Sequence, residues 1–117
     1  MNVNFDLQKN VLIIQPVCDL DHHHVEQLRE VIDYNIGKKE VHHILFDLSE
    51  VSFADSSGIG LILGRYKKIG EKKGQAGFIN VLESVKAVLK ISGVFLLAKE
   101  YKNQKAAVEA LSKGGRK

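Results

Sequence analysis

The stretch Val51-Ser52-Phe53-Ala54-Asp55-Ser56-Ser57-Gly58-Ile59-Gly60 joins an apolar run to a segment with helical spacing. The run before it, centred on Ile44-Leu45-Phe46, has no polar alternation, which favours a strand covered on both faces. The residues after Asp55 predict a helix over about 57–72, since apolar side chains recur near one side of it: Ile59, Ile62, Leu63, Tyr66 and Ile69. A buried strand that leads through a short loop into an amphipathic helix is typical of an α/β fold.

The start of this predicted helix combines an acid with two hydroxyls. The first four N–H groups of a helix lack intrahelical partners and carry the positive end of the macrodipole. A phosphoryl group on Ser56 or Ser57 is therefore expected to meet free donors. Helix capping by Asp55 is the plainer interpretation, and a cap stabilises a helix by about 1 kcal/mol. Gly58 and Gly60 favour a further use for this segment, because glycine inside a helix costs about 1 kcal/mol relative to alanine.

Strand and helix patterns alternate along the rest of the chain. Strands are predicted at 3–7, 11–14, 76–81 and 94–98, and helices from Asp21 to Gly37, at 84–91 with Gly93 as C-cap, and from Asn103 onward. The order ββαβαβαβα predicts one α/β domain over residues 1–117, with a small mixed, mostly parallel sheet of four or five strands and about four helices packed against it. The basic end, 113–117, is expected to be a frayed tail.

Two loops that follow predicted strands carry acidic and hydroxyl side chains. Ligand and signalling sites collect beyond the carboxyl ends of parallel strands. The loops at 17–21 and 49–56 occupy such positions. If their strands are parallel neighbours, one edge of the sheet brings together Asp19, Asp21, Asp55, Ser56 and Ser57.

Composition places the chain among ordinary soluble globular proteins, since 44% of its 117 residues are hydrophobic and 26% are charged. The net charge of +3 is small, and no nucleic-acid partner is predicted. A single cysteine, Cys18, excludes an internal disulfide and a cysteine-based zinc site, and the histidines at 22–24 and 42–43 lack metal-ligand spacing. We find neither a signal peptide nor an apolar run of about 18 residues, so a cytoplasmic protein without membrane contact is expected.

Catalytic and cofactor-binding motifs fit the sequence poorly. Gly58-Ile59-Gly60 with Gly64 misses the dinucleotide fingerprint, because the third glycine comes one residue late. No Gly-Lys-Ser or Gly-Lys-Thr forms a P-loop, and Asp-Ser-Ser-Gly is not the Gly-x-Ser-x-Gly elbow of a serine hydrolase. We therefore predict neither an enzyme nor a cofactor. Gly60 and Gly64, one helical turn apart, form a flat stripe for close packing or for a partner, with packing the favoured interpretation.

Three segments together resemble a known family: residues 51–68, Leu20-Asp21-His22-His23 and Ile91-Ser92-Gly93-Val94. They are similar to the anti-sigma factor antagonists of the STAS domain family, above all those of endospore-forming bacteria. The resemblance implies a small sheet of four or five strands with helices against it. It also implies that the chain binds an anti-sigma factor that is a serine kinase, and so releases a sporulation sigma factor. Phosphorylation by the kinase would turn binding off, and a phosphoserine phosphatase would turn it on again.

The resemblance also assigns roles to residues. Ser56 matches the phosphoacceptor, with Ser57 as the next candidate, and Asp21 and Asp55 match the acids beside it. The family's usual Gly-Glu-Leu-Asp reads Cys18-Asp19-Leu20-Asp21 here, so the glycine is missing while the acid at 19 is kept.

A docking surface is expected around this phosphosite. The residues next to the phosphate would be Asp19, Asp21, Asp55, Ser57 and Gly58, and those that bind the partner Asp21, Ser56 and, on the exposed side of the helix, Gly60, Gly64 and Arg65. The free chain is expected to be a monomer. The alternative function is a nucleotide or small-molecule sensing module that uses the same glycine-rich loop.

Overall fold

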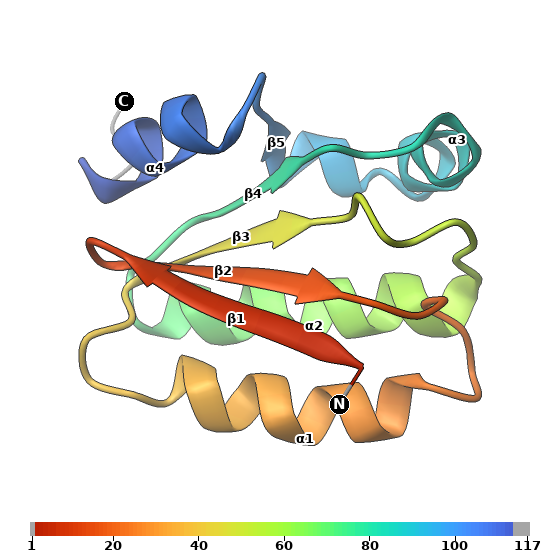
Figure 1. The fold of residues 1–117 in the computed structure, drawn as a ribbon, viewed down its shortest axis with the longest axis horizontal. Coiled ribbons are helices and arrows are strands. Elements are labelled where there is room, and N and C mark those ends of the chain that lie inside the picture. The colour runs from red at the N-terminus through yellow and green to blue at the C-terminus, as the bar shows by residue number, and fades with distance from the viewer. Residues whose placement is uncertain (1, 114–117) are drawn as a thin grey trace.

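Five strands form one mixed sheet in the computed structural model, which describes residues 2–113. The strands are β1 (Val3–Gln8), β2 (Val11–Pro16), β3 (His43–Asp47), β4 (Ala76–Ile79) and β5 (Lys99–Glu100). They lie in sequence order across the sheet (Figure 1). β1 and β2 are an antiparallel hairpin, and β2 to β5 are parallel. The predicted mixed, mostly parallel sheet is therefore confirmed.

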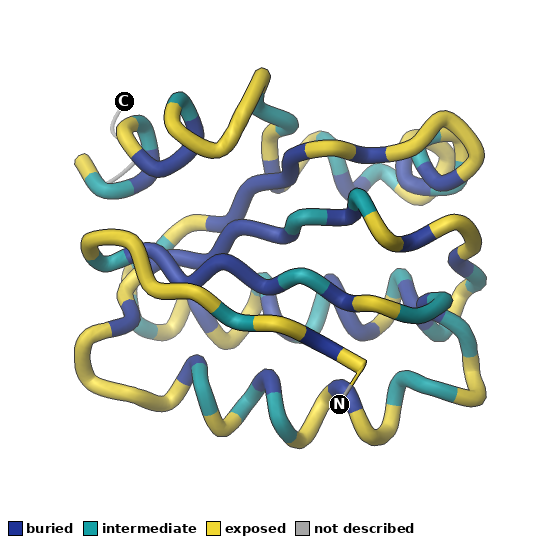
Figure 2. The backbone as a smooth tube through the Cα atoms, in the orientation of Figure 1, coloured by how far each residue is buried: buried dark blue, intermediate teal, exposed yellow. Residues whose placement is uncertain are grey.

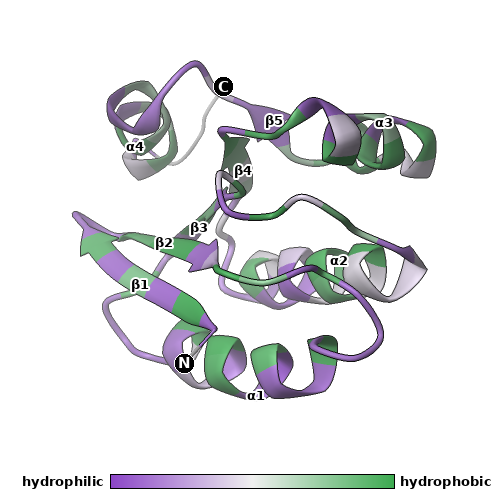
Figure 3. Ribbon diagram, turned by 45° about the vertical axis from the view of Figure 1, so that its right-hand side comes forward, coloured by the Kyte–Doolittle hydropathy of each residue, from purple (hydrophilic) through white to green (hydrophobic). Residues whose placement is uncertain are grey.

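Four α-helices cover the two faces of this sheet. They are α1 (Val25–Ile36), α2 (Ser56–Glu71), α3 (Glu83–Ser92) and α4 (Gln104–Ser112), with a short 3₁₀ helix, η1 (Val94–Leu96), after α3. α1 and α2 lie together below the sheet and α4 lies above it (Figure 1). α1 is two-sided, with hydrophobic and hydrophilic residues on opposite sides (Figure 3). The class and the number of elements agree with the sequence prediction.

Alternate residues of the central strands belong to two separate hydrophobic clusters, one on each face of the sheet. The larger cluster packs Leu12, Ile14, Ile44, Phe46 and Phe78 against α1, α2 and α3. The smaller one, on the other face, joins α4 to the sheet through Val11, Ile13, Leu45, Ile79, Ala107, Val108 and Leu111. The middle of the sheet is therefore buried on both faces (Figure 2), as the unbroken apolar run of β3 predicted.

The predicted strand at 94–98 is wrong. Gly93 adopts φ +83° and ends α3, which confirms it as the C-cap, and the chain then turns at once into η1. Backbone bonds run from Leu97 and Ala98 to the carbonyl of Val94, so this segment satisfies its amides locally rather than in the sheet. Within residues 94–100, only Lys99–Glu100 pairs with β4. The side chain of Leu96 is 90% exposed, although its apolar character suggested a strand.

The first helix begins later than predicted, at Val25 rather than directly after Asp21. Asp21 instead accepts the N–H of His24 through Oδ1 (3.1 Å) and holds a turn before the helix. α1 buries Leu28, Ile32 and Ile36 as its period indicated. The predicted tail at 113–117 lies outside the described residues except for Lys113, which is exposed.

Two polar contacts join α1 to α2. Nε of Arg65 lies 2.8 Å from Oδ1 of Asp33 on α1. Lys72, at the end of α2, donates from Nζ to the carbonyls of Ile36 (2.7 Å) and Lys38 (2.9 Å). These carbonyls belong to the last turn of α1 and the residues just after it, so a cation from one helix satisfies acceptors at the end of another.

His43 is expected to make stability depend on pH. Its side chain is 1% exposed, and Nδ1 accepts the N–H of Gln75 at 3.0 Å. Burial, reinforced by the charge of His42, lowers the pKa of His43. The unfolded chain therefore takes up a proton at a higher pH than the folded one, and stability falls as the pH drops through the unfolded value of about 6.5.

Urea unfolding between about pH 7.5 and 5.5 measures this effect. One group contributes a slope of at most about 1.4 kcal/mol per pH unit. His43→Asn, which keeps an acceptor for Gln75 but does not titrate, should have a shallower slope than the wild type. Equal slopes in both proteins would contradict the assignment, and His22→Asn, at an exposed position away from His43, serves as the control.

Candidate functional site

The loops after β2 and β3 lie side by side, as their positions at the carboxyl ends of parallel strands predicted. Leu20 and Ala54 form a parallel bridge between them. The N–H of Leu20 donates to the carbonyl of Phe53 (2.9 Å), and the N–H of Asp55 donates to the carbonyl of Leu20 (3.1 Å). Ser52 Oγ adds a bond to Asp19 (3.3 Å). The two loops thus form one ordered edge, and the predicted convergence of Asp19 and Asp55 is confirmed.

Asp55 caps α2, as its place before the helix suggested. Its Oδ1 accepts the N–H groups of Ser57 (2.8 Å) and Gly58 (3.3 Å), and its Oδ2 accepts the N–H of His22 (3.3 Å). The N–H of Ile59 donates to the carbonyl of Asp55 (3.1 Å). Three of the first four amides of α2 therefore have partners already. The expectation of free donors for a phosphoryl group at this helix start is wrong to that extent, because Asp55 occupies them.

Replacing Asp55 with alanine is expected to lower the free energy of unfolding by about 1 kcal/mol, within a range of about 0.5–2 kcal/mol for lost N-caps. The lost bonds include the one to His22, which ties α2 to the neighbouring loop. Chemical denaturation measures the change. Asp55→Ser, which retains a capping oxygen, is the matched control and should lose less. An unchanged free energy of unfolding in Asp55→Ala would show that the cap contributes nothing.

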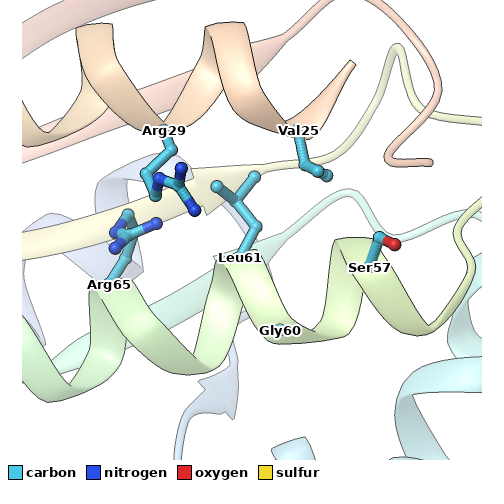
Figure 4. A pocket seen from close by; sticks show the side chains of 6 residues that line it. All are labelled: Val25, Arg29, Ser57, Gly60, Leu61 and Arg65. Carbon is cyan, nitrogen blue, oxygen red and sulfur yellow. The ribbon is translucent and has the colours of Figure 1, made fainter. Parts of the chain in front are cut away.

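The two serines at the start of α2 differ in exposure. Ser56 is exposed, whereas Ser57 is half-buried and turned toward the space between α1 and α2 (Figure 4). The hydroxyl of Ser56 is therefore the one open to a modifying enzyme. Sequence chemistry alone did not separate these two residues.

Asp21 stands beside this edge on the preceding loop. Its Oδ1 lies 2.7 Å from Nδ1 of His24. Desolvation raises the pKa of Asp21, but the hydrogen bonds from His24 outweigh it, and the net shift is downward. Asp21 is therefore a carboxylate at neutral pH.

Cys18 stands where the resembling family has glycine. Its backbone has no positive φ, so the loop does not need glycine there. Burial, followed by the charges of Asp21 and Asp19, raises the pKa of the Cys18 thiol, and the sulfur lies 3.8 Å from the carbonyl oxygen of Asn2. The substitution is accommodated without a special backbone conformation.

Gly58, Gly60 and Gly64 of α2 differ in what surrounds them. A Cβ on Gly58 would lie 2.2 Å from the carbonyl oxygen of Leu20, so glycine is required for α2 to pack on the loop before α1. A Cβ on Gly60 or Gly64 would meet nothing within 4 Å. The favoured interpretation of Gly60 and Gly64 as a packing stripe is wrong, since no residue between 2 and 113 fills the space beside them.

Arg65 does not lie on the exposed side of α2, and its predicted placement there is wrong. It is 5% exposed and pairs with Asp33 of α1, because position 65 shares the α1-facing side of the helix with Leu61. Burial lowers the pKa of the Arg65 guanidinium, Asp33 raises it, and Arg29 lowers it further.

Exposed apolar side chains flank the paired loops, and sequence reasoning missed them. Phe53, between Ser52 and Ala54, is 51% exposed; Val17 and Leu82 are 42% and 41% exposed. Ser84 Oγ donates to the carbonyl of Ser52 (3.0 Å), which brings the start of α3 to this edge. The available signal was an aromatic residue in a polar loop, because exposed aromatics are enriched in interfaces.

Comparison with known proteins shows the family. The model of the STAS domain matches residues 2–107. The chain belongs to the STAS domain family. This STAS domain is 35% identical over 113 residues to an anti-sigma F factor antagonist of Paenibacillus polymyxa, covering 95% of this chain and 97% of that one.

Solved structures agree with this membership. The anti-sigma factor antagonist SpoIIAA in its unphosphorylated form is 28% identical, with a TM-score of 0.78 over 92% of this chain and 95% of that one. The Bacillus cell fate determinant SpoIIAA in its phosphorylated form is also 28% identical, with a TM-score of 0.70 over 92% and 96%.

Within residues 2–113, no helix has the length and apolar character needed to cross a membrane. In the same part of the chain, no group of three or more His, Cys, Asp and Glu side chains is arranged to hold a metal ion.

Proposed function

We propose that this STAS domain is an anti-sigma factor antagonist that is switched by phosphorylation of Ser56. The observation that carries the proposal is the exposed hydroxyl of Ser56 at the first residue of α2, on an edge built from two paired loops. The similar protein from Paenibacillus polymyxa is named an anti-sigma F factor antagonist, and the similar SpoIIAA has a structure in a phosphorylated form. Both names support the proposal.

The switch acts at the surface and leaves the fold in place. A phosphate would add about 1.5 to 2 negative charges beside Asp55 and near the carboxylates of Asp19 and Asp21. Asp55 already bonds the amides of Ser57 and Gly58, so the phosphate does not take them without displacing the cap. The added charge therefore faces outward, where it repels an acidic group or displaces a close contact of the partner.

The docking surface combines the paired loops with the open side of α2. It contains Asp21, Ser56, Gly60 and Gly64, with Phe53 as an apolar anchor. The absence of side chains at Gly60 and Gly64 lets a partner approach the helix backbone closely. Arg65 is left out of this surface because it is buried against α1. Gly58 serves the surface indirectly, by holding α2 against the loop that carries Asp21.

The partner under this proposal is an anti-sigma factor that is also a serine kinase, and its capture releases a sporulation sigma factor. A phosphoserine phosphatase restores the binding form. The free protein is a cytoplasmic monomer that binds rather than catalyses, and it needs no cofactor.

Phosphorylation by the anti-sigma factor of the source organism tests the proposal. The wild type, Ser56→Ala and Ser57→Ala are each incubated with this kinase and ATP and then weighed by intact-mass spectrometry. We expect one phosphate on the wild type and on Ser57→Ala, and none on Ser56→Ala. Phosphate on Ser56→Ala would show that another residue is the phosphoacceptor. Phosphate on none of the three forms would overturn the proposed switch.

Direct titration of the isolated chain with ATP or GTP tests the alternative function, a nucleotide-sensing module. Saturable binding of nucleotide to the isolated chain, weakened by Gly60→Ala, would favour a sensing module over a purely protein-binding role.

A further inference from the structure

A groove of about 310 Å³ runs between α1 and α2, and it shares Gly60 with the docking surface. Six residues line it: Val25, Arg29, Ser57, Gly60, Leu61 and Arg65 (Figure 4). Its volume is at the lower end of the range for small-molecule sites, about 300–1,000 Å³. The groove can thus hold a small ligand.

Two guanidinium groups face one another at one end of this groove (Figure 4). Arg65 reaches it from α2 and is 5% exposed; its Nε lies near Asp33. A guanidinium has five N–H donors in a planar fork, so one carboxylate contact leaves most of them available. Within residues 2–113, Arg65 has no other acidic partner.

Arg29 supplies the second guanidinium from α1. Its ion pair is with Glu26, whose side chain is 70% exposed. Exposed pairs at this spacing contribute little, so Arg29 can exchange Glu26 for another anion at small cost. The charge of Arg29 also acts on Arg65, since it adds to the lowering of the Arg65 pKa. Two cations held close together, one of them buried, are stabilised by an anion between them.

The rest of the groove has a different character. Leu61 and Val25 project into its middle, and Ser57 stands toward the other end (Figure 4). Gly60 contributes no side chain, and a Cβ there would meet nothing within 4 Å, so the groove stays open beside Leu61. A ligand that fits both ends has an anionic head and an apolar body.

We propose that this groove binds a small organic phosphate, with Arg29 and Arg65 holding the phosphate and Leu61 and Val25 contacting the organic part. Phosphate matches the guanidinium fork through paired N–H···O bonds, which is the geometry arginine favours over lysine. Neither Ser56 nor Asp55 lines the groove, so the Ser56 hydroxyl is not needed to bind this ligand.

Calorimetric titration with phenyl phosphate and, separately, with inorganic phosphate tests the site. Phenyl phosphate is expected to bind saturably and more tightly than inorganic phosphate, because Leu61 and Val25 contact the ring. Arg29→Gln should weaken the binding of phenyl phosphate at least about tenfold, since it removes charge-assisted hydrogen bonds. The Arg29 side chain is 46% exposed, so the substitution leaves the core intact. Lys68→Gln removes the same charge from an exposed site on α2 outside the groove, and should change affinity less than about twofold.

A second variant tests the role of Arg65. Arg65→Lys retains the charge beside Asp33 but loses the fork, and should weaken phenyl phosphate while its unfolding curve remains cooperative. No saturable binding to the wild type would overturn the proposal, as would equal losses in Arg29→Gln and Lys68→Gln. Ser56→Ala should bind phenyl phosphate like the wild type, so failure of this site and failure of the Ser56 switch are separate results.

Discussion

Gly58→Ala is expected to destabilise the protein by about 3 kcal/mol, at or above the upper end of the usual cost of overpacking. The added Cβ would lie 2.2 Å from the carbonyl oxygen of Leu20 and 2.7 Å from its Cβ. The carbonyl oxygen is backbone, and it also accepts the N–H of Asp55, so it cannot move without breaking that bond. The better helix propensity of alanine, about 1 kcal/mol, offsets only part of the clash.

Gly60→Ala is the matched control for this effect, with the opposite sign. It lies two residues further along the same helix, and its new Cβ would meet nothing within 4 Å. The substitution should raise the free energy of unfolding by up to about 1 kcal/mol. Urea denaturation of both variants measures the two changes. Similar gains in both would mean that helix propensity, rather than contact with Leu20, decides the outcome.

Phosphorylation of Ser56 is expected to weaken binding to the anti-sigma factor by at least about a hundredfold, because juxtaposed like charges in an interface cost several kcal/mol. The same phosphate should change the free energy of unfolding by no more than about 1 kcal/mol, as is usual for a charge at a helix N-terminus. Binding and stability therefore respond very differently to one modification.

Calorimetry with the phosphorylated and unphosphorylated forms measures the affinity, and hydrogen exchange of both forms measures the fold. Ser56→Ala should bind like the unphosphorylated protein, since it adds no charge. Ser57→Ala that has been phosphorylated on Ser56 is the matched control, and it should lose binding as the wild type does. A broad rise in exchange across the sheet on phosphorylation would show that the switch unfolds the protein instead of altering its surface.

Much of the fold was predictable because burial imposes a period on the sequence. The apolar run of β3 indicated a central strand, and the spacing of Leu28, Ile32 and Ile36 indicated a helix. The meeting of the loops at 17–21 and 49–56 followed from strand direction alone. Asp55 was recognisable as a cap by its residue type and place. These features depend on local pattern or on topology, both of which are visible in a sequence.

Other features depended on which neighbour a side chain meets in space. The sequence predicts Arg65 on the exposed side of α2 with Gly60 and Gly64, whereas Asp33 on another helix makes its burial tolerable. Gly60 and Gly58 are both helical glycines near one another in sequence, yet only Gly58 touches another segment. The apolar residues at 94–98 suggested a strand, but the positive φ of Gly93 turns the chain into η1 instead. Such outcomes are decided by tertiary contacts that periodicity does not encode.

The bond from Lys72 to the end of α1 has a consequence for the motions of this protein. Local opening of the last turn of α1 must break hydrogen bonds that originate on α2, and the contact between Arg65 and Asp33 links the same two helices further along. α1 and α2 therefore open as one cooperative unit, whereas α4, with its own cluster on the other face, can open independently. We therefore expect a partner that binds α2 to slow amide exchange at the end of α1 that Lys72 contacts.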